Sequence, residues 1–73
     1  KRQYVYSRIV QAIHEGIQTD LTEIRLFELS GTDVYMTSKR ETWEAGLRTA
    51  LEYFEQTENY ERCGQIMILL SRL

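Results

Sequence analysis

Apolar residues recur at helical spacing in the first part of the chain. Between residues 4 and 17, written YVYSRIVQAIHEGI, they lie three or four positions apart, with charged and amide side chains between them. This spacing is typical of a helix that buries one face. It predicts a helix over residues 4–17 whose buried face is formed by Tyr6, Ile9, Val10, Ile13 and Ile17.

The pattern changes in the next segment. TEIRLFEL and DVYMTS are rich in β-branched and aromatic residues, and they flank SGTD, a turn sequence that contains glycine. This combination predicts a β-hairpin. Alternation is poor in the first strand, because Glu28 would share a side with Ile24 and Leu26. A two-stranded hairpin is only marginally stable in water, so we expect it to pack on the helices or to pair across a dimer.

A helix is the alternative for residues 20–37. Asp20 is followed three residues later by Glu23. This is the spacing of a capping box, in which two residues satisfy free N–H groups at the start of a helix. A helix here would make the chain all-α, with four short helices.

Helical spacing returns after residue 38. Ser38 and Glu41 again have the spacing of a capping box. The apolar stripe that follows is formed by Trp43, Leu47, Ala50, Leu51 and Phe54. The segment TEN then interrupts the pattern, and Thr57 or Asn59 can cap a last helix.

Two helices with so short a connection form an antiparallel pair. The predicted fold class is therefore α+β: an N-terminal helix, a β-hairpin and a C-terminal antiparallel helical hairpin.

The last helix is apolar around most of its circumference, because residues 66–70 read IMILL. A stripe through Met67 and Leu70 can pack on the preceding helix, whereas Ile68 points elsewhere. Such a helix is usually buried on more than one side. We therefore expect a homodimer, with burial by the first helix and the hairpin as the alternative. The predicted interface residues are Ile66, Ile68, Leu69 and Leu73.

Length and composition indicate one small domain over residues 1–73. A chain this short is marginally stable on its own, and its single cysteine, Cys63, excludes an internal disulfide. A net charge of −2 provides no general attraction for nucleic acid. No run approaches the ~20 apolar residues of a membrane span. The lone thiol and the missing signal peptide suggest a reducing, cytoplasmic location, and a start at Lys1 suggests a fragment of a longer chain.

The sequence contains no arrangement of residues that predicts catalysis. His14 and Cys63 are the single members of their types. Cys63 falls on an apolar stripe, where a free cysteine behaves as a small hydrophobic residue. No phosphate-binding loop, zinc-ligand spacing or calcium loop occurs. We expect no enzymatic activity, no metal and no cofactor.

Two charged surfaces are candidates for binding. The acidic one is either a solvated helix face or a docking site for a basic partner. Its residues are Glu41, Glu44, Glu52 and Glu55. The basic one is interleaved with Tyr4 and Tyr6, as in proteins that hold single-stranded nucleic acid by phosphate contacts and base stacking. Its residues are Lys1, Arg2, Arg8, Lys39 and Arg40.

Residues 47–73, LRTALEYFEQTENYERCGQIMILLSRL, resemble the UVR-type helical hairpin. The similarity covers about a third of the chain and lies in Leu47, Ala50, Tyr60, Glu61, Cys63 and Ile66. Ile66-Met67-Ile68 stands where that family has a leucine-arginine-aspartate step. The UVR hairpin occurs in subunits of nucleotide-excision-repair nucleases and in some chaperone ATPases, where it mediates protein–protein contacts. The resemblance implies interaction rather than catalysis.

These features predict a non-catalytic protein–protein interaction or oligomerisation module with a regulatory or accessory role. A nucleic-acid-binding accessory domain is the alternative. In the first case, Ile68→Glu is expected to weaken association without unfolding the chain.

Overall fold

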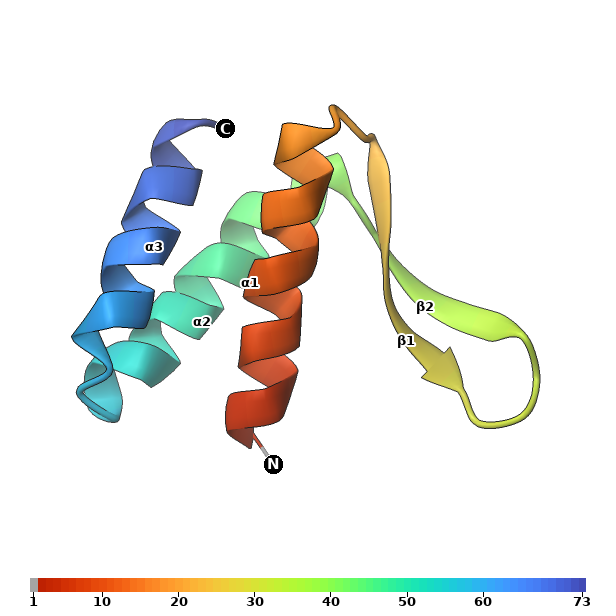
Figure 1. Cartoon of the computed structure of the whole chain (residues 1–73), viewed down its shortest axis with the longest axis horizontal. Helices are drawn as coiled ribbons and strands as arrows, with labels where there is room; N and C mark the ends of the chain where they lie inside the picture. The colour runs from red at the N-terminus through yellow and green to blue at the C-terminus, as the bar shows by residue number, and fades with distance from the viewer. Residues whose placement is uncertain (1) are drawn as a thin grey trace.

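A helix, a β-hairpin and a pair of helices follow one another along the chain (Figure 1). The computed structural model describes residues 2–73, with Leu29 described by its backbone alone. The elements are α1 (Arg2–Gln18), β1 (Glu23–Leu29), β2 (Val34–Lys39), the 3₁₀-helix η1 (Arg40–Thr42), α2 (Trp43–Gln56) and α3 (Tyr60–Ser71). The predicted α+β fold is confirmed, and the all-α alternative is wrong.

The core lies among the three helices. α1 contacts α2, α3 and β1, and α2 packs along α3 (Figure 1). Nearly all of the buried apolar side chains come from the helices: Val10, Ala12, Ile13, Trp43, Leu47, Ala50, Phe54, Ile66 and Leu69. Tyr6 of α1 stacks on Tyr53 of α2, with ring centroids 4.7 Å apart, and this contact extends the core toward the N-terminal end of α1.

The orientation of α3 differs from the prediction. Ile66 and Leu69 point into the core, whereas Met67 is 58% exposed, so the inner face does not run through Met67. Cys63 and Leu70 pack against the same core, so the inward residues lie at positions i, i+3, i+6 and i+7, on one face of the helix. Because residues 66–70 are all apolar, their sequence pattern alone does not decide which of them face the core. The buried face is therefore chosen by α1 and α2.

One predicted helix cap is present and one is not. Asn59 caps α3, because its Oδ1 accepts a hydrogen bond from the backbone N–H of Arg62 at 3.2 Å. Ser38, by contrast, does not begin a helix but lies in β2, and α2 begins at Trp43. The carbonyl of Ser38 accepts a hydrogen bond from the indole Nε1 of Trp43 at 3.0 Å. Pairing with β1 thus keeps residue 38 extended.

The end of α1 is a tight turn, not the start of a second helix. Asp20 has a left-handed φ of 56°, so it does not form the predicted capping box. The backbone N–H of Leu21 donates to the carbonyl of Gly16 at 2.9 Å, and that of Asp20 donates to Ile17 at 3.3 Å. This is the Schellman pattern of helix termination. Gly16 itself is buried, and a Cβ there would lie 2.6 Å from Cη2 of Trp43.

The hairpin explains the poor alternation in its first strand. β1 and β2 are antiparallel, with Arg25 opposite Thr37 and Phe27 opposite Met36, so Leu26 is an extra residue in a β-bulge. A bulge changes the side that later residues face. Leu26 and Phe27 are consequently both half-buried, although they are neighbours in sequence.

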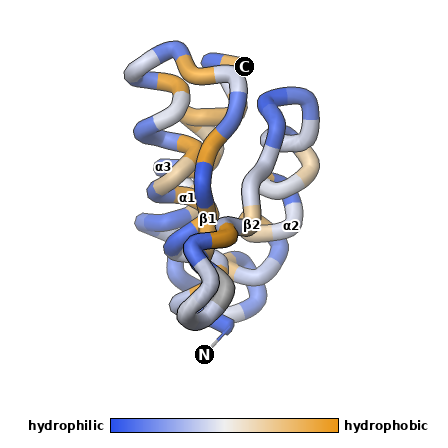
Figure 2. Tube along the Cα trace, turned by 90° about the vertical axis from the view of Figure 1, so that its right-hand side faces the viewer, coloured by the Kyte–Doolittle hydropathy of each residue, from blue (hydrophilic) through white to orange (hydrophobic). Residues whose placement is uncertain are grey.

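The hairpin lies beside the helices, which cover mainly one of its two strands. β1 lies next to α1, whereas β2 is exposed over most of its length. Figures 1 and 2 place the tip of the hairpin level with the N-terminal end of α1. The hairpin therefore packs on the helices, which is one of the two expected arrangements, and it does so mainly through β1.

Candidate interaction surfaces

Exposed apolar side chains gather on the outer face of α3. Tyr60 is 67% exposed and Ile68 is 63% exposed, and Met67 lies beside them. A Cβ on Gly64, between these residues along the helix, would meet no atom within 4 Å. We call Tyr60, Gly64, Met67 and Ile68 the α3 surface.

Only part of the predicted interface lies on this surface. Ile68 and Leu73 are exposed, as the prediction requires. Ile66 and Leu69 are buried within the single chain, so their assignment to an interface is wrong. They cannot touch a partner unless α3 leaves α1 and α2. Leu73 instead lines a cleft of about 310 Å³ with Arg40, Glu41 and Glu44.

A second group of exposed apolar side chains lies on β2. Val34, Tyr35 and Met36 follow one another and are all exposed. Because successive side chains of a strand point to opposite faces, the hairpin exposes apolar groups on both sides. Met36 is opposite Phe27, whose ring lies 6.3 Å from that of Tyr4 in α1. Tyr35 is on the other face, under the guanidinium of Arg25 at 4.6 Å.

The outer edges of the two strands differ. On β1, the side chain of Arg8 donates hydrogen bonds to the carbonyls of Leu26 at 3.0 Å and Arg25 at 3.1 Å. Arg8 thus covers the edge where the bulge lies. On β2, no further strand pairs within residues 2–73, since the sheet consists of β1 and β2. The outer edge of β2 is open along its length.

The base of the hairpin fixes which backbone groups of β2 point outward. The N–H of Arg40 donates to the carbonyl of Thr22 at 2.9 Å, so residue 40 faces β1. Backbone groups alternate along a strand in an antiparallel pair. Met36 and Ser38 therefore also face β1, whereas the N–H and C=O groups of Tyr35 and Thr37 point away from it.

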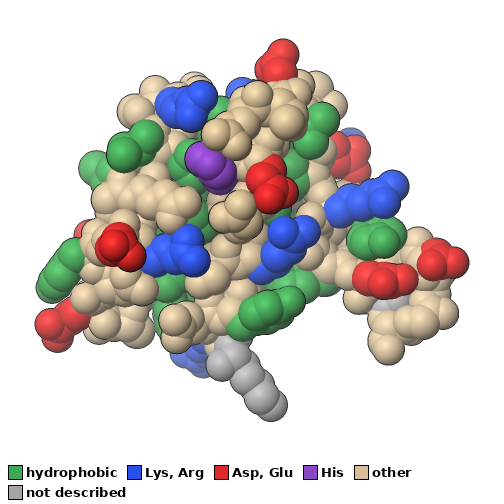
Figure 3. Space-filling view, in the orientation of Figure 1, with side chains coloured by type: hydrophobic (Ala, Val, Ile, Leu, Met, Phe, Trp, Pro, Cys, Tyr) green, Lys and Arg blue, Asp and Glu red, His purple; other side chains and the backbone are tan. Residues whose placement is uncertain are grey.

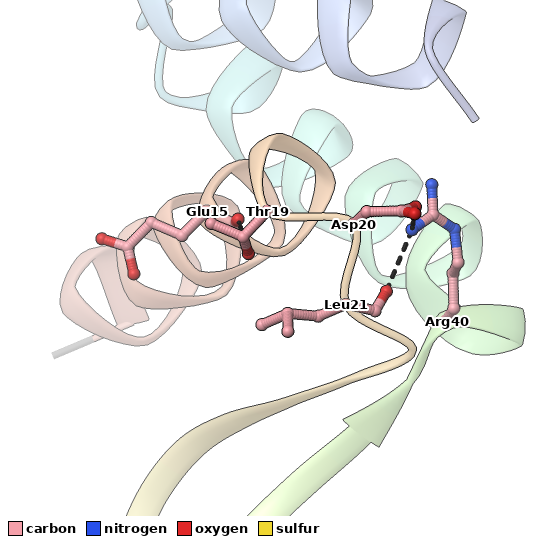
Figure 4. Close-up of polar contacts among 5 residues, drawn as sticks. All are labelled: Glu15, Thr19, Asp20, Leu21 and Arg40. Atoms are coloured by element: carbon pink, nitrogen blue, oxygen red, sulfur yellow. Dashed lines mark hydrogen bonds and ion pairs between the residues drawn. The ribbon is translucent and has the colours of Figure 1, made fainter.

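The predicted basic surface is not assembled. Arg8 is bound to β1. Arg40 donates to the carbonyl of Leu21 at 3.0 Å and lies 3.7 Å from a carboxylate oxygen of Asp20 (Figure 4). Its guanidinium also covers the ring of Trp43. Both cations therefore hold the fold together. Arg2 and Lys39 are exposed, but they lie near opposite ends of α1. Arg2 begins this helix, whereas Lys39 is opposite Glu23 in the hairpin, beyond the C-terminal end of the helix. Lys1 lies outside the described residues.

The predicted acidic residues lie at the protein surface. All four, Glu41, Glu44, Glu52 and Glu55, are exposed. Glu44 accepts a hydrogen bond from Nε of Arg48 at 3.1 Å, one turn further along α2. Figure 3 shows acidic and basic side chains interspersed over the visible face, without a large area of one sign.

Cys63 and His14, the single members of their types, are both half-buried. Cys63 is a half-buried free thiol that packs against the core. His14 is half-buried, and its Nδ1 has no hydrogen-bond partner. No cluster of His, Cys, Asp and Glu that would hold a metal ion occurs among residues 2–73. A groove of about 340 Å³ between α1 and β1 is lined by residues that include Arg8, Leu21 and Ile24.

These observations define a small α+β domain whose distinctive features are two exposed apolar surfaces and an open strand edge. No family model, curated protein or solved structure matches the chain. The resemblance of residues 47–73 to the UVR-type hairpin therefore stays a prediction. Within residues 2–73, no helix has both the length and the apolar character needed to cross a membrane.

Sequence reasoning missed the exposed apolar surface of β2. The signal was the run Val34, Tyr35, Met36 beside a turn, since a strand with apolar groups on both faces needs a cover on both. The open edge had no signal, because the position of a strand in a sheet depends on tertiary structure.

Proposed function

We propose that this chain is a non-catalytic interaction module that self-associates. The observation that carries the proposal is the exposure of Val34, Tyr35 and Met36, three consecutive apolar residues of a strand with a single partner strand. A hairpin of two strands has little stability of its own in water. Contact with a second molecule would cover these side chains and stabilise the hairpin.

The α3 surface adds to the same argument. Contiguous exposed apolar patches on soluble proteins commonly mark interaction sites, and Tyr60, Met67 and Ile68 form such a patch on one helix. Exposure of both surfaces supports a role in interaction. A regulatory or accessory role is consistent with a module of this kind.

Nucleic-acid binding has weaker support. Phosphate contacts require Lys and Arg side chains that are free to reach the nucleic acid. Arg8 and Arg40, two of the five predicted contacts, hold backbone carbonyls instead. No specific feature of the structure favours this alternative.

Sedimentation equilibrium tests the proposed function. We expect the average mass to rise from that of one 73-residue chain toward that of two as the concentration is raised from low to high micromolar. The mass of a single chain at every concentration would contradict self-association.

A further inference from the structure

The open edge of β2 identifies the surface and the partner for this self-association. We infer that β2 pairs antiparallel with β2 of a second copy of the chain, forming a four-stranded sheet in the order β1–β2–β2–β1. The inference rests on the proposed function and deepens it. The two copies would be related by a two-fold axis through the centre of the sheet.

β2, and not β1, is the strand available for pairing. Arg8 already occupies carbonyls on the outer edge of β1, at Arg25 and Leu26. Exposed edge strands in proteins are commonly protected by proline, by bulges or by inward-pointing charges. β2, with the sequence VYMTSK, has none of these features. The bulge of the hairpin lies in β1, and the one charged residue of β2 is Lys39 at its end.

The outward backbone groups restrict the register. In a two-fold pair, outward-facing residues must oppose outward-facing residues, and these are Tyr35 and Thr37. With Met36 opposite Met36 of the second copy, Tyr35 of each chain is opposite Thr37 of the other. Each such pair exchanges two N–H···O=C hydrogen bonds, and symmetry supplies the pair twice.

Charge complementarity favours this register over its neighbours. It brings Lys39 of each copy opposite Asp33, the turn residue that precedes β2. A register centred on Thr37 would instead bring Lys39 opposite Tyr35 and would leave Asp33 beyond the end of β2, without an opposite charge. A register centred on Tyr35 would bring Lys39 opposite Gly31, which leaves both the lysine and the aspartate without an opposite charge.

Apolar contact supports the same arrangement. Met36 and Val34 share the face of the hairpin on which Phe27 and Tyr4 lie, and each is 52% exposed. Across the axis, the two Met36 side chains would form a pair of the closely spaced kind, with Cα atoms about 4.5 Å apart. Methionine adapts well to such a contact, because it is unbranched and flexible.

The test compares Thr37→Pro with Thr37→Val by sedimentation equilibrium of the full chain. Proline removes the outward N–H without removing a bond to β1, whereas valine keeps the N–H and the β-branched shape. We expect Thr37→Pro to have the mass of one chain at concentrations where the wild type and Thr37→Val have the mass of two. Circular dichroism checks that each variant is folded.

A cross-linking experiment tests the register and does not depend on the folding of the proline variant. In a Cys63→Ser background, Met36→Cys is expected to form a disulfide-linked dimer on mild oxidation, because the distance between the two residues across the axis suits a disulfide. Tyr35→Cys in the same background is expected to cross-link poorly, since it is opposite Thr37.

The outcomes separate this inference from the proposed function. A dimer that persists in Thr37→Pro but dissociates in Ile68→Glu would overturn pairing through β2 and would assign self-association to the α3 surface. Equal cross-linking at residues 35 and 36 would overturn the register. A wild-type chain that stays monomeric would overturn both proposals and would leave the edge to a strand of another protein.

Discussion

In the helical part of the chain, Trp43, Leu47 and Phe54 of α2 are completely buried. In the hairpin, by contrast, Ile24 is the one buried residue among those whose side chains the structure describes. The three helices supply one another with apolar surface. The hairpin receives most of its cover from α1, over β1, and Trp43 of α2 holds its base. A single copy of the chain therefore buries the apolar side chains of the helical region but leaves many of those in the hairpin exposed.

This difference suggests a division of roles. The helices provide a core that does not require a partner, so the chain can keep its fold while the hairpin is bound or free. Trp43 links the regions, because its ring lies in the helical core and its Nε1 donates to Ser38 of β2. The hairpin is therefore held at its base and left exposed at its tip.

The largest expected effect concerns the orientation of α3. Replacing Ile66 with alanine should lower the free energy of unfolding by about 2–5 kcal/mol, because the side chain is fully buried and its removal leaves a cavity. Ile68→Ala, two residues away, should change it by less than about 0.5 kcal/mol, because Ile68 is exposed. Urea denaturation followed by circular dichroism measures both. Similar losses for the two variants would mean that α3 is rotated.

A smaller effect concerns the contact between α1, the hairpin and α2. A Cβ at residue 16 would lie 2.6 Å from Trp43 and 2.7 Å from Ile24. Gly16→Ala should therefore destabilise the protein by about 1–3 kcal/mol, the usual cost of overpacking, although alanine favours a helix. Gly64→Ala is the matched control, since its Cβ has open space, and it should gain up to about 1 kcal/mol. If both variants gained stability in thermal unfolding, Gly16 would not be a close contact.

The smallest of these effects concerns the attachment of β1. Arg8→Met keeps most of the length of the side chain but removes the two hydrogen bonds to β1. We expect a loss of about 1–2 kcal/mol, in the range of hydrogen bonds to charged groups at partly exposed positions. Amide hydrogen exchange should accelerate in the hairpin and not in α2 or α3. Arg2→Met is the control, because Arg2 has an exposed side chain at the start of α1, and it should leave the exchange rates of the hairpin unchanged. Equal exchange rates in the two variants would count against the role of Arg8.

Much of the fold could be predicted from the sequence, because its strongest signals are local. The stripe from Trp43 to Phe54, the turn SGTD and the cap at Asn59 each depend on residues close together in the chain, and each appears in the structure. The bulge at Leu26 left a trace as well, in the poor alternation of β1.

The errors came from features that tertiary contacts decide. Ser38 has the spacing of a helix cap, but its pairing with Ile24 keeps it in β2. Ile66 and Leu69 were predicted at an interface because the sequence could not orient a helix that is apolar nearly all round. Arg8 and Arg40 were grouped as basic residues because their carbonyl partners, 17 to 19 residues away in sequence, belong to other elements.

Amide hydrogen exchange within β2 tests the central claim, that a second copy completes the hairpin but not the helical core. The amides of Tyr35 and Thr37 point away from β1, so they should exchange rapidly in a dilute sample and become protected as the concentration rises. The amides of Met36 and Ser38, which face β1, should change little, as should those in the middle of α2. Rapid exchange at residues 35 and 37 in a sample with the mass of two chains would contradict the account.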